Sequence, residues 1–206
     1  MTFQYQNAHT VTLELAPFVI RNARERAAAI EDENERAGRP AVQGQSGYGP
    51  DSVERRVSGY CGESAVAALL GLDPVRGTGD HFQNRPDVGG FDVMTTKRHD
   101  GRLIFTPKNP LWSVKVLVVD ESPFFHVCGC YPCAEARNHP EWWQVPRPNG
   151  GCWMVPQPFL REIDAAPDTK PVPESVKRDL LRFSRDWRGA LRAAGLRDPN
   201  DLTPNA

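Results

Sequence analysis

The sequence predicts a mixed α/β domain of the α+β kind, with a mixed central β-sheet flanked by helices and a helical tail at its C-terminal end. Two helix-like segments come first, four strand-like runs follow, and a proline-rich linker precedes one more helical stripe. The chain has 206 residues and a formal net charge of −1. This length suits one core, and this charge excludes a generally basic nucleic-acid condenser or an acidic disordered chain.

The first half of the chain carries the predicted helices. Residues 10–14 alternate weakly and predict a short strand. Residues 16–37 place apolar side chains at helical spacing, which predicts a first helix. A second helix is expected over 51–70, ending at Gly71. Its last part, 65–70, is apolar all round, which predicts burial against a sheet.

The middle of the chain carries the predicted strands. Asp100-Gly101 is a tight-turn signal between the first two strand-like runs. The order of the runs predicts an antiparallel meander, with a weak helix over 133–138 and a fifth strand over 152–155. The four runs are residues 90–96, 102–106, 113–119 and 124–130.

The composition changes again near residue 167, so we expect a core domain over 1–166 and a linker with a tail over 167–206. An amphipathic, basic helix is expected from Pro173 to about Ala194. Its arginines could contact phosphates, or they could form a solvated face whose apolar stripe packs on the domain.

The sequence predicts a cytoplasmic protein. Its longest apolar runs are far shorter than the ~20 residues that a bilayer requires, so no membrane partner is expected. The first residues resemble no secretory signal. Five cysteines, three of them within six positions, suit free thiols in a reducing compartment.

Three acidic residues form the main candidate site. Asp87 precedes two glycines, and Asp92 begins a strand-like run. Two carboxylates this close repel each other unless a cation lies between them. Glu63, on an apolar helix turn, could supply a third oxygen ligand for Mg²⁺ or Mn²⁺. The alternative is an ordinary turn at Asp87 and a strand-edge charge at Asp92.

At this point residues 62–72, GESAVAALLGL, and 86–105, PDVGGFDVMTTKRHDGRLIF, resemble the PD-(D/E)XK nuclease superfamily, and more narrowly its small phage-encoded members. The resemblance covers about residues 10–163. It implies a restriction-endonuclease-like core and Mg²⁺- or Mn²⁺-dependent cleavage of nucleic acid, DNA above all, in the cytoplasm of a host cell.

The resemblance also implies residue roles. Glu63 would be the helix-borne acid, and Asp87 and Asp92 would ligate the metal. The lysine of the motif should stand two positions after Asp92, where this chain has Met94. Lys97 and Arg98 follow closely and are the candidate substitutes: strand alternation favours Arg98, and chemistry favours Lys97.

A second cluster combines cysteine and histidine. Alternation along a strand would point its first three members the same way, and CxxC spacing suits Zn²⁺. The alternative is a set of buried free thiols. The tryptophan pair at 142–143 could stack on bases, or it could belong to the core. The members of the zinc cluster are His126, Cys128, Cys130, Cys133 and His139.

Two hypotheses follow for the function. The first is a divalent-metal-dependent nuclease, with weakened activity if no residue replaces the missing lysine. The second is a catalytically inactive binding module of the same fold, a phage accessory or inhibitor that binds nucleic acid or a host protein. The residue that separates them is Met94.

Overall fold

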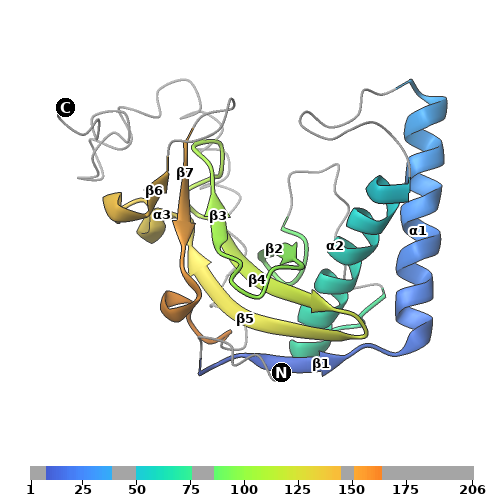
Figure 1. The fold of residues 1–206 in the computed structure, drawn as a ribbon, viewed down its shortest axis with the longest axis horizontal. Coiled ribbons are helices and arrows are strands. Elements are labelled where there is room, and N and C mark those ends of the chain that lie inside the picture. The colour runs from blue at the N-terminus through green and yellow to red at the C-terminus, as the bar shows by residue number, and fades with distance from the viewer. Residues whose placement is uncertain (1–7, 39–49, 76–85, 145–150, 164–206) are drawn as a thin grey trace, which may run out of the picture. The chain divides into compact units, whose positions relative to one another are not determined.

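The computed structural model describes residues 8–38, 50–75, 86–144 and 151–163. All of them belong to one compact unit, Met1–Ala165. The predicted linker and basic helix of the tail lie outside the described residues. The described part combines helices with a mixed sheet, which confirms the mixed α/β class (Figure 1).

Two long helices pack side by side along one face of a sheet (Figure 1). Strand β1, Val11–Glu14, leads into α1, Pro17–Arg36, whose first turn begins with proline, a residue suited to that position. The buried side chains of α1 recur every three or four residues, as amphipathic packing requires. Helix α2, Pro50–Leu69, lies against α1 and against strand β2.

The larger sheet has the strand order β1-β5-β4-β2. Its remaining strands are β2, Phe91–Thr96, β4, Val114–Glu121, and β5, Phe124–Pro132. Strand β5 pairs antiparallel with both β1 and β4, whereas β2 pairs parallel with β4. The sheet is therefore mixed, as predicted.

A smaller antiparallel sheet has the order β3-β7-β6. Its strands are β3, Leu103–Phe105, β6, Trp143–Gln144, and β7, Cys152–Val155. Three short helices complete the described part: α3, Cys133–Ala136, η1, Pro140–Trp142, and η2, Gln157–Phe159. Among the described helices, none is long and apolar enough to cross a bilayer.

The predicted meander is wrong for its first two runs, whereas the last two, at 113–119 and 124–130, do pair antiparallel as β4 and β5. The run at 90–96 pairs parallel with that at 113–119, because the run between them leaves to join the smaller sheet. Both faces of the larger sheet are thus buried, each against a different layer of the protein. Val116 and Val118 pack toward α1 and α2, while Leu117 and Val119 pack toward the smaller sheet. This division decides which polar side chains of β2 and β4 can meet.

Candidate active site

Asp87 is held by a tight turn in front of β2. Val88 and Phe91 exchange both of their backbone hydrogen bonds, at 3.0 and 2.8 Å. The two residues between them, Gly89 and Gly90, have φ angles of +53° and +94°, which favour glycine. The turn folds back far enough for the Val93 backbone N–H to donate a hydrogen bond of 2.8 Å to Asp87 Oδ2. Asp87 is therefore fixed against the start of β2.

Asp92 lies beside a lysine that sequence reasoning missed. In the parallel ladder Asp92 is the register partner of Lys115 on β4. Burial, and next the charge of Asp87, raise the pKa of the Asp92 carboxyl, while Lys115 lowers it. Burial lowers the pKa of the Lys115 ammonium, and Asp92 is the strongest of the charges that oppose this. The two side chains are thus electrostatic partners.

The Lys115 ammonium is anchored as well as charged. Its Nζ donates a hydrogen bond of 3.1 Å to the Ile104 backbone carbonyl on β3, and it lies 5.5 Å from the centroid of the Phe105 ring. These contacts come from the smaller sheet, so the lysine joins the two sheets where β2 begins. The sequence signal was present: Lys115 is the one charged residue within the run SVKVLVV.

Glu63 approaches Asp87 from α2. It is 4% exposed, and burial followed by the negative charge of Asp87 raises its pKa to about 8, while Arg26 opposes the shift. Glu63 is therefore mostly protonated at neutral pH. The charge of Asp87 thus acts on both other acids, and Asp87 is the central member of the set.

Asp87 is the acid that acts on both of the others, since its charge raises the pKa of Glu63 and of Asp92. Within the four described stretches of chain, no three His, Cys, Asp or Glu side chains lie close enough together to hold a metal ion. An ion at this place would rely on Asp87 and Asp92, with other ligands from outside the set.

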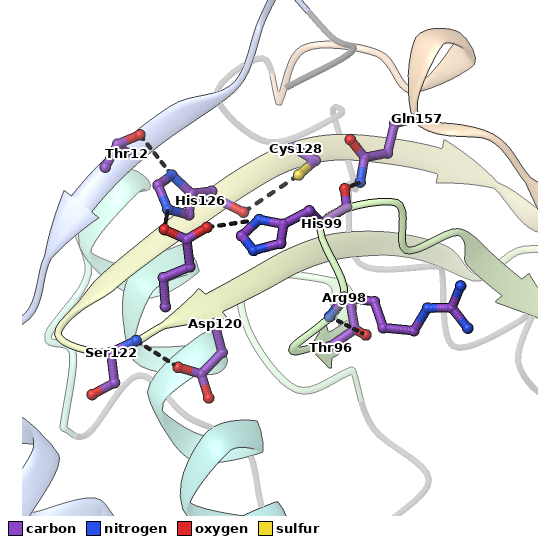
Figure 2. Close-up of polar contacts among 10 residues, drawn as sticks. Thr12, Thr96, Arg98, His99, Asp120, Ser122, His126, Cys128 and Gln157 are labelled. Atoms are coloured by element: carbon purple, nitrogen blue, oxygen red, sulfur yellow. Dashed lines mark hydrogen bonds and ion pairs between the residues drawn. The ribbon is translucent and has the colours of Figure 1, made fainter. Parts of the chain in front are cut away.

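Lys97 and Arg98 do not reach this site. Strand β2 ends at Thr96, whose hydroxyl accepts a hydrogen bond of 3.2 Å from the Arg98 backbone N–H (Figure 2). The Arg98 guanidinium then turns outward and bonds the Asp100 carboxylate at 3.0 and 2.8 Å. Lys97 lines a cavity at the opposite end of β2. The lysine that the ladder places beside Asp92 is instead Lys115.

The predicted zinc residues are spread over several places. A bulge between β4 and β5 pairs Leu117 with Gly129 and the next residue with Val127, which leaves Cys128 as the extra residue. Cys128 consequently packs toward the smaller sheet, while Cys130 packs toward the helices. The prediction that both point the same way is wrong. Cys133 is buried in the same apolar cluster as Cys128, but its thiol lies 3.9 Å from the Asn109 carbonyl, whereas that of Cys128 lies 3.5 Å from the His126 carbonyl.

The two histidines of the predicted cluster have other partners. His126 is buried between Thr12, whose Oγ1 lies 2.9 Å from Nδ1, and Glu121, whose Oε2 lies 3.3 Å from Nε2 (Figure 2). The second oxygen of Glu121 lies 2.7 Å from His99 Nδ1. His139 stacks on Trp142 with ring centroids 3.9 Å apart, so Trp142 belongs to the core and is not a free base-stacking platform.

Comparisons with family models, with curated proteins and with solved structures found no match to this chain. The case for the candidate site therefore rests on the arrangement of its residues alone. That geometry brings together Asp87, Asp92 and Lys115 where β2 and β4 begin, with Glu63 adjacent on α2.

Proposed function

We propose that the chain is a divalent-metal-dependent phosphodiesterase with a restriction-endonuclease-like core, acting on nucleic acid, DNA above all, in the cytoplasm. Lys115 takes the role of the lysine that the PD-(D/E)XK pattern places two residues after Asp92. The observation that carries the proposal is the parallel register in which Asp92 faces Lys115. The electrostatic coupling of this pair to Asp87 supports it.

A lysine on β4 can replace a lysine on β2 because of strand geometry. Residues i and i+2 of one strand are about 6.6 Å apart, whereas register partners on neighbouring strands are separated by about 4.8 Å. The backbone of Lys115 is therefore closer to Asp92 than that of Met94 is. Met94 itself packs against the apolar cluster between the sheets. The positive charge that the motif expects at position 94 of β2 is thus present on the neighbouring strand, β4.

The two aspartates fit a cation that keeps most of its water. Asp87 raises the pKa of Asp92, so a positive ion between them would relieve a repulsion that the protein now contains. Mg²⁺ is usually held by one or two carboxylates together with substrate phosphate and water, so a pair is sufficient. When bound, such an ion polarises a phosphoryl oxygen and lowers the pKa of a bound water.

Each of the chain's own residues would then have a separate role in the reaction. Asp87 and Asp92 hold the cation, and the hydrogen bond from Val93 N–H keeps Asp87 oriented. The Lys115 ammonium lies where it can offset negative charge that develops on a phosphoryl group. Glu63, mostly protonated at neutral pH, can donate a hydrogen bond to an oxygen beside Asp87.

The test is a cleavage assay with matched variants. Supercoiled, linear and single-stranded DNA, and RNA, are incubated with the protein in Mg²⁺, Mn²⁺ or EDTA. We expect metal-dependent cutting that Asp92→Asn and Lys115→Met each abolish. Lys108→Met, which removes an exposed lysine from a turn, is the control and should cut as the wild type does. Equal cutting by wild type and Asp92→Asn would refute the assignment.

A second variant tests the role of Lys115 directly. Combining Lys115→Met with Met94→Lys moves the ammonium from β4 to the motif position on β2. We expect this double variant to regain part of the activity that Lys115→Met loses. If Lys115→Met alone is as active as the wild type, the lysine has no part in the reaction.

The inactive binding module remains the second candidate, and one observation favours it. The Lys115 ammonium already donates a hydrogen bond to the Ile104 carbonyl, so its charge also has a structural use. On this proposal the protein binds nucleic acid or a host protein without cutting. Retention of labelled DNA by the wild type, with no cleavage in any metal, would select this candidate.

A further inference from the structure

An exposed tryptophan lies at the edge of the sheet that carries the candidate active site. Among the described tryptophans, Trp142 and Trp153 are buried and Trp143 is half-buried, whereas Trp112 is 50% exposed. Tryptophan is strongly buried on average, so half exposure of this side chain leaves a large, flat apolar surface in contact with water. Trp112 therefore offers a ligand the most exposed indole ring in the described part of the chain.

The position of Trp112 relates it to the candidate active site. Strand β4 begins two residues later, at Val114, which is the register partner of Phe91, the first residue of β2. Because the ladder is parallel, Trp112 lies at the edge where Asp92 and Lys115 face each other. Trp112 is three positions before Lys115, so their Cα atoms are at most about 11 Å apart. A base next to a phosphate at Lys115 can therefore reach the indole.

The loop between β3 and β4, which carries Trp112, is fixed by hydrogen bonds near both of its ends. Near its start, the Asn109 side-chain oxygen accepts a hydrogen bond of 2.7 Å from the Thr106 backbone N–H. Near its end, the backbone N–H groups of Cys133 and Ala134 donate to the carbonyls on either side of Trp112, at 2.9 and 3.1 Å. A ring carried on an ordered loop loses little conformational entropy when it binds, so Trp112 is preorganised for a ligand.

We propose that Trp112 stacks on an unpaired base of a single-stranded DNA substrate. This inference rests on the proposed function, because the phosphodiester chemistry of Asp92 and Lys115 favours a nucleic acid over a protein as the ligand at this edge. Aromatic side chains stack on the bases of single strands whatever their sequence. In a duplex the face of each base is covered by its neighbours, so a fixed indole at this edge favours single strands over duplexes.

The test is fluorescence anisotropy of a labelled oligothymidylate with the full chain, in EDTA so that nothing is cut. We expect saturable binding of the single strand, at least about tenfold tighter than that of a duplex of the same length. Trp112→Ala should weaken binding of the single strand about fivefold or more, the effect of losing one base stack. Phe124→Ala is the matched control and should bind as the wild type does, since it removes a 44% exposed ring beside the last residue of β4, at the opposite end of that strand.

Two further comparisons test whether the ring stacks on a base. An abasic strand of the same length keeps the phosphates and lacks the bases, so the wild type should bind it more weakly than oligothymidylate, and this difference should shrink in Trp112→Ala. Trp112→Phe keeps a flat ring and should bind oligothymidylate more tightly than Trp112→Leu, which keeps apolar surface without a ring. Because Trp112 is half exposed, these variants should fold, and urea denaturation checks that they do.

The inference is overturned if Trp112→Ala binds the single strand as tightly as the wild type, or if the wild type binds single strand and duplex equally. A dimer that Trp112→Ala dissociates, with no DNA binding, would also overturn it and would assign the ring to an interface between two copies of the chain.

The inference and the proposed nuclease activity can fail separately. Binding of single strands through Trp112, with no cleavage in any metal, would refute the nuclease and leave the inference standing. Metal-dependent cleavage of single strands that Trp112→Ala leaves unchanged, together with unchanged binding, would refute the inference and leave the nuclease standing.

Discussion

Replacing Glu63 by glutamine should make the stability of the protein less dependent on pH. The Glu63 side chain is 4% exposed and its pKa is raised to about 8. In the unfolded chain the carboxyl returns to its ordinary pKa, near 4.5. The folded protein therefore binds this proton more tightly, and folding is favoured most when the proton is present.

The sign and size of the effect follow from this difference. The stabilisation is complete below pH 4.5 and is lost as the pH rises through about 8. At about 1.4 kcal/mol for each pH unit, the pKa difference corresponds to at most about 5 kcal/mol. Glu63→Gln keeps the size of the side chain and removes the titration. Its free energy of unfolding, relative to that of the wild type, should rise between pH 5 and pH 9.

Urea denaturation followed by tryptophan fluorescence measures this difference, in buffers that contain EDTA so that no divalent cation intervenes. Glu54→Gln is the matched control, since it removes a carboxyl from the same helix whose side chain is 53% exposed. The control should keep the pH dependence of the wild type. Curves of unfolding free energy against pH that run parallel for the wild type and Glu63→Gln would refute the reasoning.

Two further predictions concern α2 and the thiols. A Cβ at position 62 would lie 3.2 Å from Thr95 Cβ, and closer still to its hydroxyl, so Gly62→Ala should destabilise by about 1–3 kcal/mol in urea denaturation. Gly59→Ala, which meets open space, should instead stabilise by about 0.5–1 kcal/mol. Burial raises the pKa of the Cys61 thiol to about 12, so iodoacetamide at pH 8 should modify Cys152, which is half-buried, well before Cys61, as mass spectrometry would show.

The helices and strands could be predicted closely because their signals are local. The first helix, expected over 16–37, spans Pro17–Arg36, and the second, expected over 51–70, spans Pro50–Leu69. The fifth strand, expected over 152–155, is Cys152–Val155. Spacing of apolar side chains depends only on neighbours in the chain, so periodicity alone locates these elements.

Strand pairing could not be predicted in the same way. The Asp100-Gly101 signal favours a hairpin, yet β3 leaves the larger sheet and pairs with β7. A turn signal describes how the chain bends, whereas the choice of partner depends on which apolar faces meet. The bulge at Cys128 could not be predicted from the sequence for the same reason, since it depends on the register between β4 and β5.

The candidate site shows the same division. Asp87, Asp92 and Glu63 were predicted from their types and spacing, and their electrostatic coupling through Asp87 is present. Lys115 was missed because its nearness to Asp92 exists only in the parallel ladder. Lys97 and Arg98 were preferred because they are close in sequence, but β2 ends before them.

The parallel register of β2 and β4 has a consequence for how proteins related to this chain can be searched for. A motif written as Asp-x-Lys assumes that both letters stand on one strand, and a scan for that string passes over a chain in which the lysine stands on the next. Here Asp92 and Lys115, the pair on which the proposed function depends, are 23 positions apart in the sequence and are ladder partners in space. Relatives of this chain are better sought by a spatial template of two carboxylates and an ammonium than by any linear string.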